Sequence, residues 1–179
     1  DIFNQMWQAA IISIASAGNS GDEPDNHACF GVNTKSYPAA FDNVISVAAL
    51  APKGKKSGFS QYGDWVDLAA PGGDQDRCLE LVDLTDEEIE YWKENCNQGR
   101  IDSPQCNQIK EKILNYSKCS LARGILSTIA PTVVNDFKEN DYKSFQGTSQ
   151  AAPLVSGLAG LIWSLNPSLS NAQVREISF

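Results

Sequence analysis

Three short runs of small and β-branched residues constrain the fold of this chain most strongly. They cover residues 9–17, 43–49 and 65–69, and glycine or proline follows the first and the third within two residues. A run that is apolar on both faces is typical of a strand in a parallel sheet that is covered on both sides. The sequence therefore predicts an α/β fold built on a mostly parallel sheet.

The strongest helix signal lies near the carboxyl end of the chain, over residues 149–165. Pro153 falls in the first turn of this helix, where a proline removes only an amide that has no helical partner. The helix is rich in alanine, glycine and serine, which predicts that other backbone approaches it closely. Weaker patterns predict helices over residues 1–8, 85–99, 103–116 and 170–179, a short strand over 124–129 and a loop over 20–33.

The segment from Asp74 to about Ala122 differs in composition from the rest of the chain. Its first part, residues 74–94, holds nine acidic and two basic residues. Thr85 followed by Glu88 forms a capping-box signature, which indicates a helix start. We interpret residues 74–122 as an acidic helical insertion. Its acid run is a solvated face, because it lacks the alternating acidic register of a calcium loop.

Four of the five cysteines fall inside this insertion, and Cys29 stands apart. No pair has the CxxC spacing of a zinc site, which argues against a metal centre. Four clustered cysteines favour two disulfides, with three connectivities open, and hence an oxidising compartment. We expect the pairs to form within the insertion and to leave Cys29 free. The alternative is a set of reduced core cysteines in a cytosolic protein. The four are Cys78, Cys96, Cys106 and Cys119.

The charge of the chain excludes two classes of partner. Its 179 residues carry a formal net charge of −8, which gives no electrostatic footprint for nucleic acid or for an anionic membrane surface. No apolar run approaches the roughly 18 to 20 residues needed to span a bilayer. Residues 1–4 do not resemble a signal peptide, so a signal for export would lie outside this sequence.

Ser149 is the first candidate for chemistry, because it lies in the first turn of the predicted helix over 149–165. The amides of such a turn have no intrahelical partner and stand at the positive end of the helix dipole. A serine there can act as a nucleophile whose own N–H donates to the oxyanion that its attack creates. The alternative is that Ser149 serves only as a helix cap.

Asn19 is the second candidate, because it follows the first predicted strand directly. Ligands of α/β proteins bind at the carboxyl ends of strands, and a carboxamide there can steady a developing negative charge without titrating. The alternative is a turn asparagine, a residue type that tolerates left-handed backbone.

Both candidates belong to a set of five segments that resembles the subtilisin-like serine proteases. By this resemblance Ser149 corresponds to the nucleophile of that family and Asn19 to its oxyanion-hole asparagine. Ser16, Ala17 and Gly18 correspond to the strand that lines the first specificity pocket and pairs with an extended substrate. Thr148 is expected to join them in binding substrate. The segments, in the order seen in the family, are SAGNSG at 16–21, YPAA at 37–40, SGFSQYG at 57–63, LAAPG at 68–72 and GTSQAAPLVSG at 147–157.

The resemblance implies a fold and an activity. The fold would be a three-layer α/β sandwich, of which residues 1–179 form a partial catalytic domain, incomplete at its N-terminus and interrupted by the insertion at 74–122. The activity would be hydrolysis of peptide bonds in polypeptides through an acyl-enzyme on Ser149, in a secreted or extracellular protein. This chemistry needs no cofactor. The family commonly binds structural calcium, for which no ligands can be assigned here.

This sequence departs from the family pattern at several positions. Gln150 stands where the family usually has methionine and Leu154 where it has histidine, but neither position performs chemistry. The triad order in subtilases is Asp, His, Ser, so both missing members should precede Asn19, which only 18 residues precede. His27 follows Asn19 in a polar loop and is not expected to be the general base. We therefore expect this chain to be inactive alone and to need the missing N-terminal half of the domain as a partner.

Two other functions fit parts of the sequence. A protease-like binding or scaffold protein with a decayed triad would keep the same motifs. An α/β-hydrolase esterase would need Gly-x-Ser-x-Gly after a buried strand. The sequence instead has Gly-Thr-Ser-Gln-Ala after the polar residues 141–146. The subtilisin-type endopeptidase accounts for more of the chain than either alternative.

Overall fold

The computed structural model describes residues 2–21, 34–75, 77–96, 103–129 and 142–178. It divides into two compact units. Unit 1 consists of residues 1–73 and 145–179, and unit 2 of residues 74–144. The expected insertion, residues 74–122, lies within unit 2.

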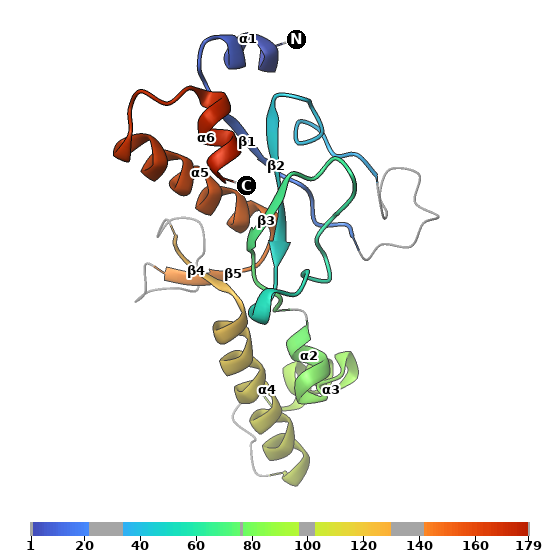
Figure 1. Ribbon diagram of the computed structural model, residues 1–179. Coiled ribbons are helices and arrows are strands. Elements are labelled where there is room, and N and C mark those ends of the chain that lie inside the picture. Colours follow the sequence, from blue (N-terminus) through green and yellow to red (C-terminus); the bar gives the residue numbers. More distant parts are fainter. Residues whose placement is uncertain (1, 22–33, 76, 97–102, 130–141, 179) are drawn as a thin grey trace. The chain divides into compact units, whose positions relative to one another are not determined.

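Unit 1 is built on a parallel sheet of three strands in the order β1-β2-β3 (Figure 1). The predicted α/β fold with a parallel sheet is therefore confirmed. In the register of the sheet, Ile14 of β1 pairs with Ile45 of β2, and Val47 of β2 pairs with Leu68 of β3. The elements are α1 (Ile2–Gln8), β1 (Ser13–Ser16), β2 (Val44–Leu50), a 3-10 turn at Pro52–Gly54, β3 (Leu68–Pro71), α5 (Thr148–Leu165) and α6 (Asn171–Ser178).

The core of unit 1 lies between the sheet and α5, which packs across all three strands, while α6 packs against α5 (Figure 1). The central strand β2 is buried along almost its whole length, as its apolar and small residues predict. Removing this apolar surface from water stabilises the sheet and helix together, at about 25 cal/mol per Å². The buried members of the core are Ile45, Val47, Ala49, Ala70, Ala151 and Val155.

Two of the predicted strands differ from the observed ones. The run over 9–17 forms a strand only at Ser13–Ser16, and this strand is half-buried rather than buried on both faces. Among the described residues β1 pairs with β2 alone, so its other edge carries no strand. The run over 65–69 begins as a turn, in which Val66 donates to the carbonyl of Gly63 at 3.0 Å, and β3 follows only at Leu68.

Helix α5 begins at Thr148, one residue before the predicted start at Ser149. Pro153 therefore lies in the second turn of the helix and not in the first turn, where the sequence had placed it. The expected close approach of other backbone is found on one side only. Ala151 and Ala159 are buried. In contrast, a Cβ added at Gly157 or at Gly160 would meet no described atom within 4 Å. The face of α5 that carries these glycines is therefore open within the described part of the chain.

Unit 2 contains four of the five cysteines and the acidic run over residues 74–94. Its longest helix, α4, continues to Arg123, beyond the predicted end at residue 116. Neither α2 nor β5 was predicted, because α2 is short and the segment that contains β5 is polar. The elements are α2 (Arg77–Val82), α3 (Asp86–Tyr91) with a π-helical turn at Trp92–Cys96, α4 (Pro104–Arg123), β4 (Ile125–Thr128) and β5 (Tyr142–Phe145), the last two forming a two-stranded sheet.

Two disulfides link the helices of unit 2. Cys78 pairs with Cys119, and Cys96 pairs with Cys106. The prediction of two disulfides within the insertion is therefore confirmed. Cys29, which was expected to be free, lies outside the described residues.

Lys112 of α4 forms an ion pair with Glu88 of α3, at 2.8 Å. The Glu88 carboxylate accepts hydrogen bonds from Lys112 and from the amide of Thr85, and these bonds lower the pKa of Glu88 below its ordinary value of 4.5. The same bond to Glu88 raises the pKa of Lys112 above 10.5. Thr85 and Glu88 form the complete capping box that their spacing predicts.

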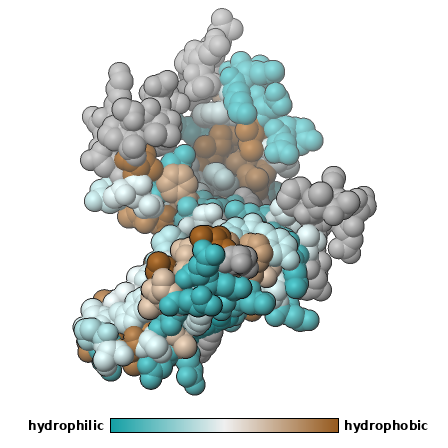
Figure 2. All heavy atoms as spheres, turned by 90° about the horizontal axis from the view of Figure 1, so that it is seen from above, coloured by the Kyte–Doolittle hydropathy of each residue, from teal (hydrophilic) through white to brown (hydrophobic). Residues whose placement is uncertain are grey.

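Hydrophobic residues reach the surface between hydrophilic ones on the face seen in Figure 2. Several large apolar side chains are exposed along α5, including Leu154 at 46%, Leu158 at 43% and Leu161 at 64%. Single exposed apolar residues are common on soluble proteins, but several on one helix indicate a surface that packs against something.

Candidate active site

Hydrogen bonds join the carboxamide of Asn19 to the first turn of α5. The Oδ1 atom of Asn19 accepts from the amide N–H of Thr148 and from its hydroxyl, each at 2.9 Å. The hydroxyl oxygen of Thr148 in turn accepts from the N–H of Gly18 at 3.1 Å. Two segments about 130 residues apart therefore meet at Thr148, which is only 1% exposed.

Two nitrogen donors border one site beside Gly147. A Cβ added to Gly147 would lie 3.3 Å from Nδ2 of Asn19 and 3.6 Å from the amide nitrogen of Ser149. Because α5 begins at Thr148, the amide of Ser149 has no intrahelical partner. The site also faces the positive end of an 18-residue helix. A developing oxyanion beside Ser149 would find two N–H donors from separate elements here.

The backbone at Gly147 requires glycine. Its φ of +148° with ψ of 159° belongs to a region that residues with a side chain rarely adopt. The Cβ of any other residue would also come within 2.7 Å of Oε1 of Gln150. This glycine allows the chain to turn sharply into α5, so that Ser149 is left exposed.

Gln61 holds the segment that precedes Asn19. Its amide N–H donates to the carbonyl of Gly18 at 2.9 Å, and its Nε2 donates to the carbonyl of Thr34 at 3.1 Å. Gly18 has a φ of +113°, and a Cβ there would lie 1.8 Å from Oε1 of Gln61. Gln61 is 5% exposed, so this amide is an internal brace between two chain segments.

A hollow of about 590 Å³ lies next to Ser149. Residues of β1, of the segment 36–38 and of the first three turns of α5 surround it. None of its described lining residues is charged. The lining is Ile14, Ala15, Ser16, Gly18, Ser36, Tyr37, Pro38, Ser149, Ala152, Pro153 and Ser156.

The sequence model of the subtilase family matches residues 1–178 of this chain. The chain belongs to the subtilase family. The match covers almost every residue, including unit 2, so the family pattern continues on both sides of the insertion.

The curated relatives of this subtilase have a modest sequence identity to it. Alkaline elastase YaB of Bacillus sp. (strain YaB) is 26% identical over 173 residues, which are 97% of this chain and 28% of that protein. Subtilisin DY of Bacillus licheniformis is 26% identical over 97% of this chain and 40% of its own length. Thermitase of Thermoactinomyces vulgaris is 26% identical over 94% of this chain and 36% of its own length. The subtilase chain thus spans well under half the length of these relatives.

Solved structures show the same fold. A protease from Pseudoalteromonas arctica PAMC 21717 superposes with a TM-score of 0.60 at 22% identity, over 98% of this chain and 37% of that chain. The epidermin leader peptide processing serine protease of Staphylococcus aureus gives a TM-score of 0.58 at 23% identity, over 98% of this chain and 35% of that chain. The subtilisin-like fold expected from the sequence is therefore confirmed.

The structure brings most of the expected site residues of this subtilase together. Asn19 and Ser149 are exposed and border one site, and Ser16 and Gly18 line the adjoining hollow. Ala17 is fully buried and does not line the hollow. Thr148, also buried, contacts Asn19 and Gly18 instead, so its effect on a substrate would pass through those two residues.

Sequence reasoning gave no role to several residues that shape the site. Ser36, Tyr37 and Pro38 line the hollow, and the amide of Gln61 donates to the carbonyl of Gly18. The family motifs at 37–40 and 57–63 were the signals that could have assigned them, since those motifs contain three of these four residues.

No histidine lies among the described residues of this subtilase. His27, the single histidine of the chain, falls outside them. Within the described residues, the Ser149 hydroxyl also has no hydrogen-bond partner that could serve as a base. The group that would take the proton from Ser149 is therefore not identified inside the described part of the chain.

The described residues contain no group of three or more histidine, cysteine, aspartate or glutamate side chains that could hold a metal ion. Asp42, Asp64 and Asp67 do line one hollow, but two cationic residues, Lys35 and Arg175, line it as well. The guanidinium of Arg175 donates to Oδ1 of Asp67 at 2.8 Å and to the carbonyl of Asp42 at 3.1 Å. With this guanidinium in place, the three carboxylates do not form a calcium site.

Across the described ranges, none of the helices combines the length and the apolar character that crossing a bilayer demands.

Proposed function

We propose that this chain is the nucleophile-bearing part of a subtilisin-type serine endopeptidase. The observation that carries the proposal is the meeting of Ser149 and Asn19 beside Gly147, at the amino end of α5. Membership of the subtilase family supports it. The substrate would be a polypeptide, and the reaction would be hydrolysis of its peptide bonds.

The chemistry follows from the geometry of these two residues. The Oγ of Ser149 attacks the scissile carbonyl carbon, and its proton passes to a base. The carbonyl oxygen becomes an oxyanion that accepts from the Ser149 amide and from Nδ2 of Asn19. Collapse of this intermediate expels the amine with a proton from the same base and leaves an acyl-enzyme. Water then attacks the ester and regenerates the serine.

The base and its orienting carboxylate would come from a segment outside this chain. The chain spans 28% to 40% of the length of the relatives named above, and its described residues include no histidine. We infer that a segment carrying the aspartate and histidine lies N-terminal to these residues in the whole protein. Without it Ser149 is an ordinary alcohol and a poor nucleophile.

An open surface of unit 1 would receive this segment. Among the described residues, one edge of β1 pairs with no strand. Ile14 of β1 also lines a hollow of about 370 Å³, together with Ile12, Ser156, Ala159, Gly160 and Trp163. Gly157 and Gly160 have space above them, and Leu154, Leu158 and Leu161 are exposed nearby along the same helix. Strands added to β1, together with helix backbone over the glycines, would bury this surface.

The hollow next to Ser149 would bind the substrate. Ser16 and Gly18 lie at the carboxyl end of β1, where an extended peptide can pair with the backbone. The hollow offers no charged partner among its described lining residues, so a neutral side chain would enter it at lower desolvation cost than a charged one.

The two disulfides support an exported protein, because disulfides persist in oxidising compartments. We propose a secreted or extracellular location on this basis.

Labelling with a serine-directed fluorophosphonate tests the function. The complete protein should be labelled at Ser149, as located by peptide mass spectrometry, and the Ser149→Ala variant should not be. Residues 1–179 alone should be labelled far more slowly. A complete protein that is folded but never labelled would instead be a binding or scaffold protein with the same motifs.

A further inference from the structure

The two ends of unit 2 connect to residues that adjoin the turn carrying Ser149. It begins directly after Gly73 and ends directly before Phe145, two residues from Gly147. The amide of Gly147 donates to the carbonyl of Gly72 at 2.8 Å. The two flanking segments of unit 2 are therefore hydrogen-bonded to each other at the start of α5.

The contact between these flanking segments is tight. A Cβ added to Gly72 would lie 2.8 Å from the carbonyl oxygen of Gly147 and 2.4 Å from Cβ of Ala49. Ser57 fixes the next residue, because its hydroxyl donates to the carbonyl of Gly73 at 2.6 Å. Any displacement of residues 72–73 would therefore displace Gly147 as well. Gly147 in turn sets the position of the Ser149 amide.

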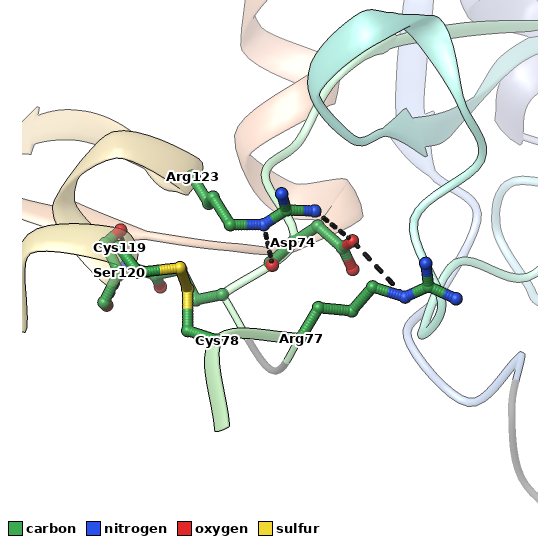
Figure 3. Close-up of a disulfide and its surroundings, with 7 residues drawn as sticks. Asp74, Arg77, Cys78, Cys119, Ser120 and Arg123 are labelled. Atoms are coloured by element: carbon green, nitrogen blue, oxygen red, sulfur yellow. Dashed lines mark hydrogen bonds and ion pairs between the residues drawn. A yellow bond between two sulfur atoms is a disulfide. The ribbon is translucent and has the colours of Figure 1, made fainter. Parts of the chain in front are cut away.

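Within unit 2, an ion pair closes the base of the insertion. The amide of Asp74 donates to the carbonyl of Arg123 at 2.9 Å, so the first residue of the unit is paired with the last residue of α4. The guanidinium of Arg123 returns two bonds, to the carbonyl of Asp74 at 3.0 Å and to its Oδ2 at 2.9 Å (Figure 3). The Asp74 side chain is only 5% exposed and that of Arg123 is 24% exposed, so the carboxylate of the pair is the better shielded partner.

Gln75 links the first and the last residues of unit 2 to α4. Its Nε2 donates to the carbonyl and the hydroxyl of Ser120, each at 2.8 Å, and reaches the carbonyl of Ser144 at 3.5 Å. Gly124 completes the packing, because a Cβ there would lie 2.0 Å from Oγ of Ser144 and 2.6 Å from Nε2 of Gln75. Residues at the start, middle and end of unit 2 thus meet around one amide group.

The Cys78–Cys119 disulfide secures this arrangement covalently. It joins the first turn of α2 to α4 one residue before Ser120, across 41 residues of sequence (Figure 3). Cys96–Cys106 links residues only 10 apart, at the other end of α4. Only the first disulfide therefore lies beside the Asp74–Arg123 pair.

We propose that these groups form a positioning device for the nucleophile. The device, which we call the neck, consists of Asp74, Gln75, Ser120, Arg123 and the Cys78–Cys119 disulfide. The neck holds residues 74–75 and 144 together within unit 2. The insertion is thereby closed into a loop, and no contact outside unit 2 has to hold the two ends of this loop together. This inference rests on the proposed function for its catalytic consequence.

The physical reason is loop closure. If the neck opens, the two ends of the insertion are no longer held together near residues 74 and 144, and the entropy cost of keeping these ends together rises with the length of the chain between the contacts that remain. The hydrogen bond between Gly72 and Gly147 is the next contact along both segments, so this bond would have to offset the added entropy cost. Fluctuation of Gly147 would move the Ser149 amide away from Nδ2 of Asn19.

Two double cysteine variants of the complete protein test the proposal. Cys78→Ala/Cys119→Ala opens the neck, and Cys96→Ala/Cys106→Ala removes the other disulfide as a matched control. Hydrogen exchange of the peptide that covers residues 145–153 should be about tenfold faster in the first variant and unchanged in the second. With a peptide substrate, the first variant should lose about tenfold in kcat with KM within about twofold, and the second should keep both values.

A second pair of variants covers the case in which the first one fails to fold. Arg123→Ala should show the same faster exchange at 145–153, and Arg123→Lys should restore part of the protection, because lysine keeps a charge near Asp74. Unchanged exchange in both neck variants would overturn the inference, whatever the activity. Faster exchange in a complete protein that no phosphonate labels would overturn the proposed function and leave the neck as a structural coupling.

Discussion

The Oδ1 atom of Asn19 accepts hydrogen bonds from both the amide and the hydroxyl of Thr148, each at 2.9 Å. Because both bonds engage the oxygen, the Nδ2 atom is the end of the carboxamide that remains for a ligand. Thr148 immediately precedes Ser149, so the residue that orients one donor also fixes the backbone of the other. The two donors of the proposed oxyanion site are thus held by one buried threonine.

Replacing Thr148 by valine should reduce the activity of the complete protein. Thr148→Val keeps the shape of the side chain but removes the donor to Asn19 and the acceptor for Gly18, so the carboxamide loses one of two restraints. We expect kcat to fall about tenfold, or about 1.4 kcal/mol, with KM little changed. Thr148→Ser keeps the hydroxyl and should retain most of the activity. Equal losses in both variants would show that the hydroxyl is not what matters.

Replacing Gly147 by alanine should lower both stability and activity. Its φ of +148° and the 2.7 Å approach of a Cβ to Gln150 make the native backbone costly for alanine. We expect the free energy of unfolding to fall by about 1–3 kcal/mol, measured by urea denaturation. Gly54→Ala is the matched control, because Gly54 has a φ of +71° with no atom within 4 Å of an added Cβ. It should cost about 1 kcal/mol and leave the activity intact.

The sequence predicted the central part of the fold better than its edges. The run over 43–49 became β2 almost residue for residue, because a strand buried on both faces consists mostly of apolar and small residues. The run over 9–17 gave a strand of four residues, since only Ser13–Ser16 has a neighbouring strand among the described residues. Composition records how apolar a segment is, but pairing decides how much of it becomes a strand.

The candidate site was predicted from local motifs, and its supports were not. Ser149 and Asn19 could be found because each stands at the end of a recognisable element. Gln61 and the Asp74–Arg123 pair act through contacts between segments far apart in sequence, at separations of 43 and 49 residues. The motif at 57–63 marks Gln61 only as part of a family segment, and nothing in the local sequence around Asp74 or Arg123 indicates that the two residues pair.

Truncating Ile45 should destabilise unit 1 strongly. Its side chain is 1% exposed in the middle of β2 and belongs to the core cluster between the sheet and α5. Ile45→Ala should lower the free energy of unfolding by about 3 kcal/mol, because it removes apolar contacts and leaves a cavity. Ile45→Val should cost only about 1 kcal/mol. Urea denaturation of the complete protein measures both, and equal midpoints for the two variants would contradict the packing described here.

Removing Lys112 should raise the pKa of Glu88 toward 4.5. The hydrogen bond from Lys112 is the largest cause of the lowered pKa of Glu88, ahead of the bond from the Thr85 amide. In Lys112→Gln the second bond remains, so the pKa should rise but stay somewhat below 4.5. Carbon-detected NMR titration of the Glu88 carboxyl measures this change. Lys118→Gln, on the same helix, is the matched control and should leave the titration of Glu88 where it was.

The pair also sets how the stability of unit 2 depends on pH. Because folding lowers the pKa of Glu88, its contribution is present above the unfolded pKa and is lost as the pH falls through the folded pKa. Because folding raises the pKa of Lys112, its contribution is present below the unfolded pKa and is lost as the pH rises through the folded pKa. The stability difference between wild type and Lys112→Gln should therefore be largest from about pH 5 to about pH 10 and should shrink outside that window. Both side chains are about 30% exposed, so the difference should be small and should shrink further in high salt. A difference that persisted unchanged at pH 2 would mean that Lys112 stabilises unit 2 through its bond to the Asp83 carbonyl rather than through Glu88.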